Sequence, residues 1–299
     1  MRLSIKFSAM ILALAVSAIS FVGISAENGF QGKLLTDYLS YDNGFQPIVS
    51  PHRGGSMPGF PENAVETLEN SMTYGPAIME VDVRTLRDGT LILMHDRTLD
   101  RTTTGEGDVS AASWEDVSAL YLKDNEGAVT DYRVPTLLDA LKVIKGKGIL
   151  NLDIKPETDF AAVMEVVRKA DAGNSVMAIT YNLEQAKAYN ELAPNIMLSV
   201  RIRNADELKA VKGSGVPLNR VVAWAGLKPM AKVMYDRLHS EGMLVMQGTL
   251  GFGPLALDRK FELSGNTDGY LNLFQQGADI IATDRHWVVQ ELLNSCCRK

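Results

Sequence analysis

Short apolar or β-branched runs alternate with longer amphipathic stretches along most of this 299-residue chain. The runs predict strands at residues 47–50, 77–83, 91–94, 148–154, 175–180, 196–200, 220–224, 243–247 and 279–283. Helical patterns lie between many of them, for example at 63–74, 137–144, 159–170, 183–191, 205–211, 228–240 and 287–293. Strands that alternate with helices over about 250 residues predict a parallel sheet with helical crossovers, and an α/β fold of the (β/α)8 TIM-barrel type fits this length.

One strand candidate exceeds the eight places of such a barrel. We expect residues 91–94 to be the extra strand, because the Asp88-Gly89 turn ties them to the strand before as a hairpin. Residues 97–133 interrupt the alternation and are rich in Thr, Gly and Asp, so we expect an excursion over one face of the barrel. A doubly wound open sheet is the alternative fold, but no Gly-rich dinucleotide loop follows the first strand.

The first 26 residues have the pattern of a secretory signal peptide. Arg2 and Lys6 precede a nearly unbroken apolar run at 9–24, and Ser25-Ala26 offers a cleavage point before Glu27. We therefore expect an exported protein, periplasmic or secreted, whose residues 27–299 form a single domain with no stable membrane span. An uncleaved N-terminal anchor is the alternative, because the apolar run is nearly long enough to cross a bilayer.

Composition narrows the class of partner. The chain is 46% hydrophobic and 22% charged, as in ordinary globular proteins. Loss of residues 1–26 removes Arg2 and Lys6 and no acid, which changes the formal net charge from −6 to −8. An acidic protein is a poor partner for nucleic acid, since phosphate neutralisation dominates that affinity. Cys296 and Cys297 are adjacent, so they cannot cross-link a long loop, and they have no metal-site spacing.

Two acids in the second strand predict a cation site. Glu80 and Asp82 are two residues apart, so both side chains point to the same face of the strand. Their neighbours Val81 and Val83 are apolar, which is typical of a strand buried on both sides. Buried paired carboxylates are costly without a cation, and their hard oxygen atoms suit Ca²⁺ or Mg²⁺. The alternative is a charged pair on the solvated face of an edge strand.

Further polar groups follow other predicted strands. Asp153 lies near a strand's carboxyl end, where barrel enzymes keep their active sites, and could complete the ligand set of the metal. Lys155, on the same face, could reach a phosphate oxygen. Arg53 offers a planar fork that matches phosphate, and two glycines follow it. His52 and His95 flank the acidic pair in sequence and can exchange protons near neutral pH.

Three other residues are less specific. Glu62 stands near the start of the first helix, where it favours the helix dipole, and it is equally suited to support the metal or His52. His239 and His286 have the settings of surface or helix-capping residues.

Taken together, these motifs resemble those of the glycerophosphodiester phosphodiesterase family. The resemblance rests on both residues and spacing, and it covers nearly the whole chain after residue 26. The motifs are His52-Arg53-Gly54, Pro61-Glu62-Asn63, Glu80-x-Asp82-Val83, Asp88-Gly89, His95-Asp96, Arg101-Thr102-Thr103-x-Gly105-x-Gly107, Val134-Pro135-Thr136-Leu137, Leu152-Asp153-Ile154-Lys155, Gly277-Ala278-Asp279 and Thr283-Asp284.

The resemblance implies a TIM barrel that hydrolyses glycerophosphodiesters to glycerol 3-phosphate and an alcohol. By position, His52 and His95 match the acid/base pair of the family, and Glu62 matches a further active-site carboxylate. The divalent-metal ligands are matched by Glu80, Asp82 and Asp153, and the phosphate-holding cations by Arg53 and Lys155. Which histidine is the acid, and whether water or a substrate hydroxyl attacks, stays open. So do the head group, the metal and the oligomeric state.

The sequence departs from the family at two places. Asp153 stands where the family commonly has Glu, and its shorter arm could move the metal or admit a water molecule. Residues 245–249 carry no aromatic, although the family usually has a Trp-containing run there that lines the glycerol side. These departures bear on the identity of the substrate more than on the reaction.

Three rival functions remain. The first is a related phospholipase D-like lyase that cleaves a phospholipid, which predicts an exposed apolar surface near the barrel mouth, with residues 250–257 as the candidate. The second is a catalytically inactive binding protein for phosphorylated solutes. The third is a metal-dependent hydrolase of another type, but its usual His-x-His strand motif is absent from the sequence.

Overall fold

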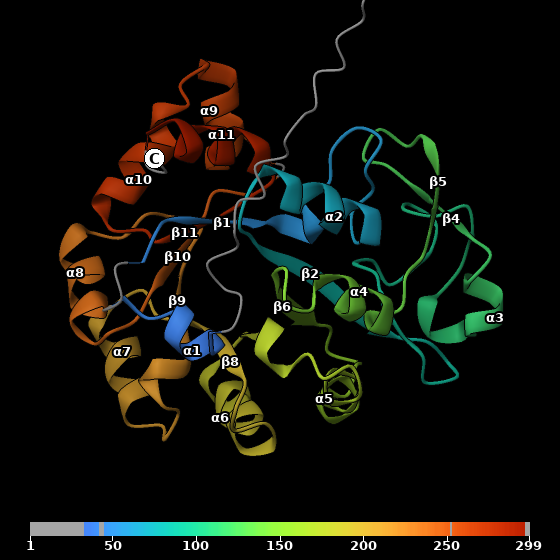
Figure 1. The fold of residues 1–299 in the computed structure, drawn as a ribbon, viewed down its shortest axis with the longest axis horizontal. Helices are drawn as coiled ribbons and strands as arrows, with labels where there is room; N and C mark the ends of the chain where they lie inside the picture. Colours follow the sequence, from blue (N-terminus) through green and yellow to red (C-terminus); the bar gives the residue numbers. More distant parts are fainter. Residues whose placement is uncertain (1–32, 42–44, 252, 297–299) are drawn as a thin grey trace, which may run out of the picture.

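Eight parallel strands form the centre of the molecule, with helices around them (Figure 1). The computed structural model describes residues 33–41, 45–251 and 253–296. The parallel strands are β1 (Ile48–Pro51), β2 (Ile78–Thr85), β6 (Ile149–Ile154), β7 (Val176–Thr180), β8 (Met197–Arg201), β9 (Val221–Gly226), β10 (Val245–Gly248) and β11 (Ile280–Thr283). The predicted signal peptide at 1–26 lies outside the described residues. Within those residues, no helix has the length and apolar character needed to cross a bilayer.

The strands close into a barrel. From β2 to β11 each of these strands pairs with the next one along the chain, and β11 pairs in parallel with β1. A parallel bridge between Val49 and Ala77, the residue before β2, joins the first strand to the second. The expected (β/α)8 barrel is therefore confirmed, and the alternative of an open doubly wound sheet is not what forms.

The extra strand is the expected one. β3 (Leu91–Leu93) runs antiparallel to β2, with Val83 opposite Leu93. A tight turn whose Gly89 has a φ of 86° joins the two strands. Only glycine adopts such a φ at little cost, which explains why Asp88-Gly89 predicts the hairpin.

The helices outside the barrel follow the predicted alternation. Several begin at a side-chain cap, such as Thr136, which forms a capping box with Asp139. The helices are α2 (Val65–Tyr74), α4 (Leu137–Ile144), α5 (Phe160–Lys169), α6 (Leu183–Leu192), α7 (Ala205–Lys212), α8 (Lys232–Ser240), α9 (Leu257–Ser264), α10 (Asp268–Gln276) and α11 (His286–Cys296). Short 3-10 turns are η2 (His52–Gly54), η4 (Gly173–Ser175) and η5 (Leu218–Arg220).

The excursion after β3 is a small substructure with its own apolar cluster. It contains η3 (Val109–Ala111), α3 (Trp114–Val117) and the antiparallel pair of β4 (Tyr121–Lys123) and β5 (Val129–Arg133). Figure 1 shows it at one side of the barrel, next to β2 and α4. Its cluster includes Val109, Val117 and Leu122, which pack with Ile92 of β3.

Alternate residues of each barrel strand face two different cores. In β2, Met79, Val81 and Val83 belong to the core between the strands and the helices. Ile78 belongs to the core inside the barrel, which Leu35 at the start of α1 (Leu35–Tyr38) also joins. Because side chains alternate along a strand, Glu80 and Asp82 lie on the same inner face as Ile78, further towards the carboxyl end of the strand.

Candidate active site

Three carboxylates of the neighbouring strands β2 and β6 lie close together. In the paired strands Glu80 lies beside Asn151 and Asp82 beside Asp153. One oxygen from each of Glu80, Asp82 and Asp153 can be chosen so that all lie within 4.8 Å of one another, which is close enough to hold one metal ion. The expected ligand set is thus brought together, and the shorter arm of Asp153 still reaches the cluster.

The charge of this cluster fits a divalent cation. Burial and the neighbouring charge of Asp82 raise the pKa of Glu80 to about 8. Lys155 Nζ lies 2.6 Å from Asp82 Oδ1 and 2.7 Å from Asp153 Oδ2, so one ammonium already offsets part of the negative charge. Two buried carboxylates and the partly buried Asp153 exceed that single charge, and an all-oxygen donor set is what Ca²⁺ and Mg²⁺ prefer. The residues present therefore fit such an ion.

Asp82 is the most tightly held of the three acids. Asn63 Nδ2 donates a hydrogen bond of 2.8 Å to its carboxylate, and Asn63 Oδ1 accepts one of 2.9 Å from its backbone N–H. Burial alone would raise the pKa of Asp82, but the charges of Lys155 and His95, with hydrogen bonds from Lys155 and Asn63, lower it. Asn63 itself has a φ of 59°, a conformation that non-glycine residues adopt mainly where neighbours enforce it.

His52 stands at the end of β1 with a carboxylate on each side. Its Nδ1 lies 2.6 Å from Asp284 Oδ1, and its Nε2 lies 3.9 Å from Glu80 Oε2. Burial would lower the pKa of His52, but the hydrogen bond with Asp284 and the charge of Glu80 outweigh it and raise that pKa. A proton on Nδ1 that is directed at Asp284 leaves Nε2 for the cavity, the arrangement that acid/base histidines use.

His95 has the same type of partner. It follows β3, and its Nδ1 lies 2.7 Å from Asp96 Oδ1. Arg84 holds the same segment, because its Nε and Nη2 donate to the backbone carbonyl of His95 at 3.0 and 2.7 Å. The charge of His95 is one of the causes that lower the pKa of Asp82. The two histidines thus share one design, in which a carboxylate binds Nδ1.

The turn η2 places Arg53 beside the acids. Its φ of 49° is left-handed, and its backbone N–H donates a hydrogen bond of 2.7 Å to Glu80 Oε2. Arg53 Nε lies 4.0 Å from Asp82 Oδ2. Arg53 and Lys155, the two predicted phosphate-holding cations, therefore both face the carboxylate cluster.

Gly54 and Gly55 of this turn are held from behind. Ser71 Oγ donates a hydrogen bond of 2.6 Å to the Gly54 carbonyl, and His286 Nε2 lies 3.0 Å from the Gly55 carbonyl. His286 was expected to be a surface or a helix-capping residue. It is fully buried, so the surface alternative is wrong, and it supports the turn from the first position of α11. His239 is also mostly buried and bonds Asp279 at 2.9 Å.

Glu62 is clamped between two arginines. Arg53 Nη1 donates to both of its oxygens, at 3.1 and 2.9 Å. Arg101, from the excursion, donates to the same two oxygens at 2.8 and 2.9 Å. The sequence suggested either a helix-dipole role or a supporting role in the site for Glu62. In the structure, Glu62 joins Arg53 of the turn after β1 to Arg101 of the excursion.

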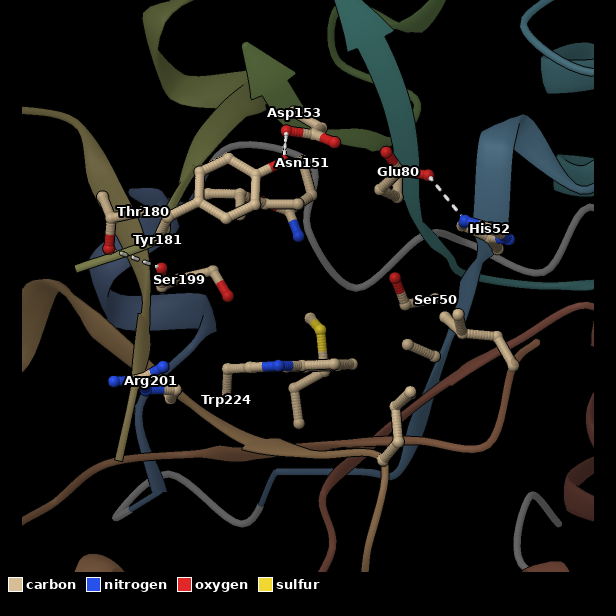
Figure 2. Close-up of a pocket in the computed structure, with 15 residues that line it drawn as sticks. Ser50, His52, Glu80, Asn151, Asp153, Thr180, Tyr181, Ser199, Arg201 and Trp224 are labelled. Atoms are coloured by element: carbon tan, nitrogen blue, oxygen red, sulfur yellow. Dashed lines mark hydrogen bonds and ion pairs between the residues drawn. The ribbon is translucent and has the colours of Figure 1, made fainter. Parts of the chain in front are cut away.

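A cavity of about 440 Å³ opens beside the acidic cluster. Figure 2 shows Glu80, Asp153 and His52 on one side of it and Ser199, Arg201 and Trp224 on the other. The full lining is Ser50, His52, Glu80, Asn151, Asp153, Ile179, Thr180, Tyr181, Ser199, Arg201, Trp224, Leu227, Met246, Leu250 and Ala282.

Sequence reasoning missed three residues of this site. Asp284, the partner of His52, was noted only as part of a family motif. Tyr181 donates a hydrogen bond of 2.5 Å to Asp153. Trp224 supplies, from β9, the aromatic that residues 245–249 lack, and Gly248 of β10 makes room for it, since a Cβ there would lie 2.4 Å from the indole.

Comparison with known proteins gives the family. A model described as the glycerophosphoryl diester phosphodiesterase family matches residues 52–246. A crystal structure of a glycerophosphoryl diester phosphodiesterase from Parabacteroides distasonis is similar with a TM-score of 0.78 and 32% identity, over 87% of this chain and 90% of that one. An Oleispira antarctica phosphodiesterase in complex with the product sn-glycerol-3-phosphate has a TM-score of 0.64 and 22% identity, over 85% of this chain and 99% of that one, which shows a shared fold.

Among curated proteins, a glycerophosphodiester phosphodiesterase of Caldanaerobacter subterraneus is 28% identical over 162 residues, which are 51% of this chain and 65% of that protein. The match therefore spans just under two thirds of that relative's length. The fold and the site together define a class of (β/α)8 barrel whose mouth combines two carboxylate-held histidines with a buried acidic cluster. The chain belongs to the glycerophosphoryl diester phosphodiesterase family.

Proposed function

We propose that this protein is an exported, metal-dependent glycerophosphodiester phosphodiesterase. In this proposal it hydrolyses glycerophosphodiesters to glycerol 3-phosphate and an alcohol. The observation that carries it is the pairing of His52 with Asp284 and of His95 with Asp96 around the acidic cluster. Two proton carriers and a cation site are what hydrolysis of a phosphodiester needs.

The roles follow from the geometry. Glu80, Asp82 and Asp153 would hold Ca²⁺ or Mg²⁺. Such an ion, when bound, supplies Lewis-acid stabilisation of the negative charge that develops on the phosphate. Arg53 and Lys155 add fixed positive charge at the same place and orient the phosphate oxygens.

The histidines divide the proton transfers. Because Nδ1 of each is held by a carboxylate, Nε2 is the nitrogen that accepts a proton from the nucleophile or gives one to the leaving alkoxide. The raised pKa of His52 favours its protonated form, which is the form needed to protonate the leaving group. We therefore assign the acid to His52 and the base to His95.

The reaction is tested by phosphodiesterase assays on glycerophosphocholine and glycerophosphoinositol with Ca²⁺, Mg²⁺ or EDTA. We expect metal-dependent release of glycerol 3-phosphate, and a loss of about 10²- to 10⁴-fold in kcat for His52→Ala and for His95→Ala. Release of a different phosphorylated product would revise the bond that is broken. A folded protein without turnover under any of these conditions would overturn the proposal.

A phospholipid-cleaving activity is the second candidate, because apolar side chains contribute to the lining of the cavity. Leu227 and Leu250 line it, and Leu255 in the segment predicted for this role is 79% exposed. The same assay with a lysophospholipid separates the two functions. Faster cleavage of the lipid than of glycerophosphocholine would favour the second one.

Export is a proposal on the sequence of residues 1–26. Mass spectrometry of the protein after secretion from a bacterial host should show a mature chain that begins at Glu27. Retention of the first 26 residues in a membrane fraction would instead indicate the uncleaved anchor.

A further inference from the structure

A continuous row of alternating charges joins the two halves of the site. It starts at His95, passes through Asp96, Arg101 and Glu62, and ends at Arg53. Asp96 Oδ1 lies 2.7 Å from His95 Nδ1. Each of the other links is formed by at least two hydrogen bonds, with donor–acceptor distances from 2.6 to 3.1 Å.

Arg101 is the centre of this row. Its Nε and Nη2 donate to the two oxygens of Asp96 at 2.6 and 2.9 Å. Its Nη1 and Nη2 donate to the two oxygens of Glu62 at 2.9 and 2.8 Å. A guanidinium can serve two carboxylates in this way because its donors lie in one plane with a fixed fork, whereas an ammonium is a point charge without that geometry.

Arg101 comes from a part of the chain that is not needed to build the barrel. It belongs to the excursion after β3, outside the regular barrel, and its side chain is 47% exposed. Exposed ion pairs usually contribute little to stability, because water screens them and the long side chain loses freedom. Glu62, however, has a side chain that is only 4% exposed, and Arg101 of the excursion binds it as a second cation beside Arg53.

Each carboxylate in the row orients a group of the proposed reaction. Asp96 accepts from His95 Nδ1, which fixes the tautomer and the ring orientation of that base. Hydrogen bonds from Arg101 lower the pKa of Asp96, so this carboxylate stays ionised. Glu62 holds the guanidinium of Arg53 from the side away from the acidic cluster.

We propose that Arg101 is a positioning residue that sets His95 and Arg53 in one geometry by binding Asp96 and Glu62 together. This inference rests on the proposed phosphodiesterase function. Arg101 acts through the carboxylates of Asp96 and Glu62, which it binds. Loss of its guanidinium group removes the hydrogen bonds to both of them at the same time. The excursion is then part of the catalytic apparatus, since it carries the residue that ties the base to the phosphate-holding arginine.

The test compares Arg101→Gln and Arg101→Lys with the wild type. We expect kcat to fall about 10- to 100-fold in both variants, the size seen when an orienting partner is lost, with a much smaller change in KM. Arg87→Gln, which removes an exposed arginine before the same excursion, is the control and should keep wild-type kcat. Thermal melts that match the wild type show that the variants fold.

A double-mutant cycle tests whether Arg101 acts through Asp96. Asp96→Asn alone should lower kcat. In the Asp96→Asn background, Arg101→Gln should lower kcat by a much smaller factor than it does in the wild type. Full additivity would overturn the proposal. A rise in KM with unchanged kcat would also overturn it, because that result would make Arg101 a substrate contact, and full activity of Arg101→Lys would reduce the role to charge alone.

A readout without turnover separates this inference from the proposed function. The ¹⁵N side-chain signals of His95 report which ring nitrogen carries the proton. Arg101→Gln should shift the tautomer populations of His95 but not those of His239, which bonds Asp279 elsewhere in the fold. Unchanged His95 signals would refute the positioning role even if the protein proves inactive on every phosphodiester.

Discussion

The two catalytic histidine candidates differ in surroundings although both bind a carboxylate through Nδ1. His52 is mostly buried at the end of the first strand and lies between Asp284 and Glu80. The side chain of His95 is 36% exposed and is bound by Asp96, the next residue in the chain. A buried histidine that gains two carboxylate neighbours holds its proton more strongly, which supports its assignment as the acid.

Replacement of Asp284 by Asn should lower kcat by about 10- to 100-fold, since an orienting partner of this kind usually contributes that much. The amide would leave His52 in a less suitable tautomer and remove the charge that favours its protonated form. Steady-state kinetics on glycerophosphocholine measures the effect. Asp279→Asn, which alters the other buried His–Asp pair of the fold, is the matched control and should retain activity per folded molecule. Equal losses in both variants would contradict the role of Asp284.

At the scale of elements, the turn η2 couples the site to the barrel wall. It carries Arg53 with a left-handed backbone, and its glycines have φ values of 84° and 95°. Such strained turns persist where the surroundings hold them, and here α2 and α11 supply the support through Ser71 and His286.

Gly55→Ala should destabilise the protein by about 1–3 kcal/mol and reduce activity, because a left-handed φ and steric overlap coincide. A Cβ at this position would lie 2.2 Å from Ser71 Oγ and 2.8 Å from the His286 ring. Gly59→Ala is the control: its φ is 79°, but no atom lies within 4 Å of its Cβ position. Urea unfolding of both variants separates the effect of steric overlap from that of the left-handed backbone. Equal decreases in the free energy of unfolding would show that the overlap at Gly55 has no effect.

The helix α11 contributes a pH response through His286. Burial lowers the pKa of His286 to about 4, so the unfolded chain binds this proton more readily than the folded one. Above about pH 6.5 neither state binds the proton, so His286 costs the folded chain no stability. As pH falls towards 4, the unfolded chain binds the proton and the free energy of unfolding decreases. Unfolding free energies of the wild type should therefore decrease over this window more steeply than those of His286→Gln. Parallel curves would show that His286 is not kept neutral by the fold.

At the scale of the whole molecule, the acidic cluster that we propose as a cation site joins two neighbouring strands of the barrel, β2 and β6. The carboxylates of Glu80, Asp82 and Asp153 repel one another, so an ion that binds them in the folded chain stabilises that chain. Ca²⁺ or Mg²⁺ at about 100 times its Kd should raise the free energy of unfolding by about 2.7 kcal/mol. Differential scanning fluorimetry measures this as an increase in Tm that EDTA reverses.

The matched variants for this measurement are Asp153→Asn and Glu165→Gln. The first should lose most of the increase in Tm, because it removes one oxygen charge from the cluster. The second changes an exposed acid on α5 and should keep the full increase. An increase of the same size in both would place the ion elsewhere.

Local sequence patterns were sufficient to predict the barrel, the β2–β3 hairpin and the shared strand face of Glu80 and Asp82. The reason is that strand alternation and a tight turn depend on residues close together in sequence. The positions of His52, His95 and Asp153 near the predicted strands also marked them as site candidates, and the family resemblance added their roles. The structure brings Asp153 to the other two acids. The three acids of the proposed cation site were thus predictable from the sequence.

The partners of those residues depend on closure of the barrel. Asp284 is 232 positions from His52, and only the pairing of β11 with β1 brings the two side chains together. Trp224 reaches the cavity because a glycine of the adjacent strand leaves space for it, and His286 is buried because α11 packs behind the turn at Gly55. Contacts of this kind join segments that lie far apart in the sequence, and no local periodicity relates those segments. Such contacts therefore form only when the tertiary structure brings the segments together.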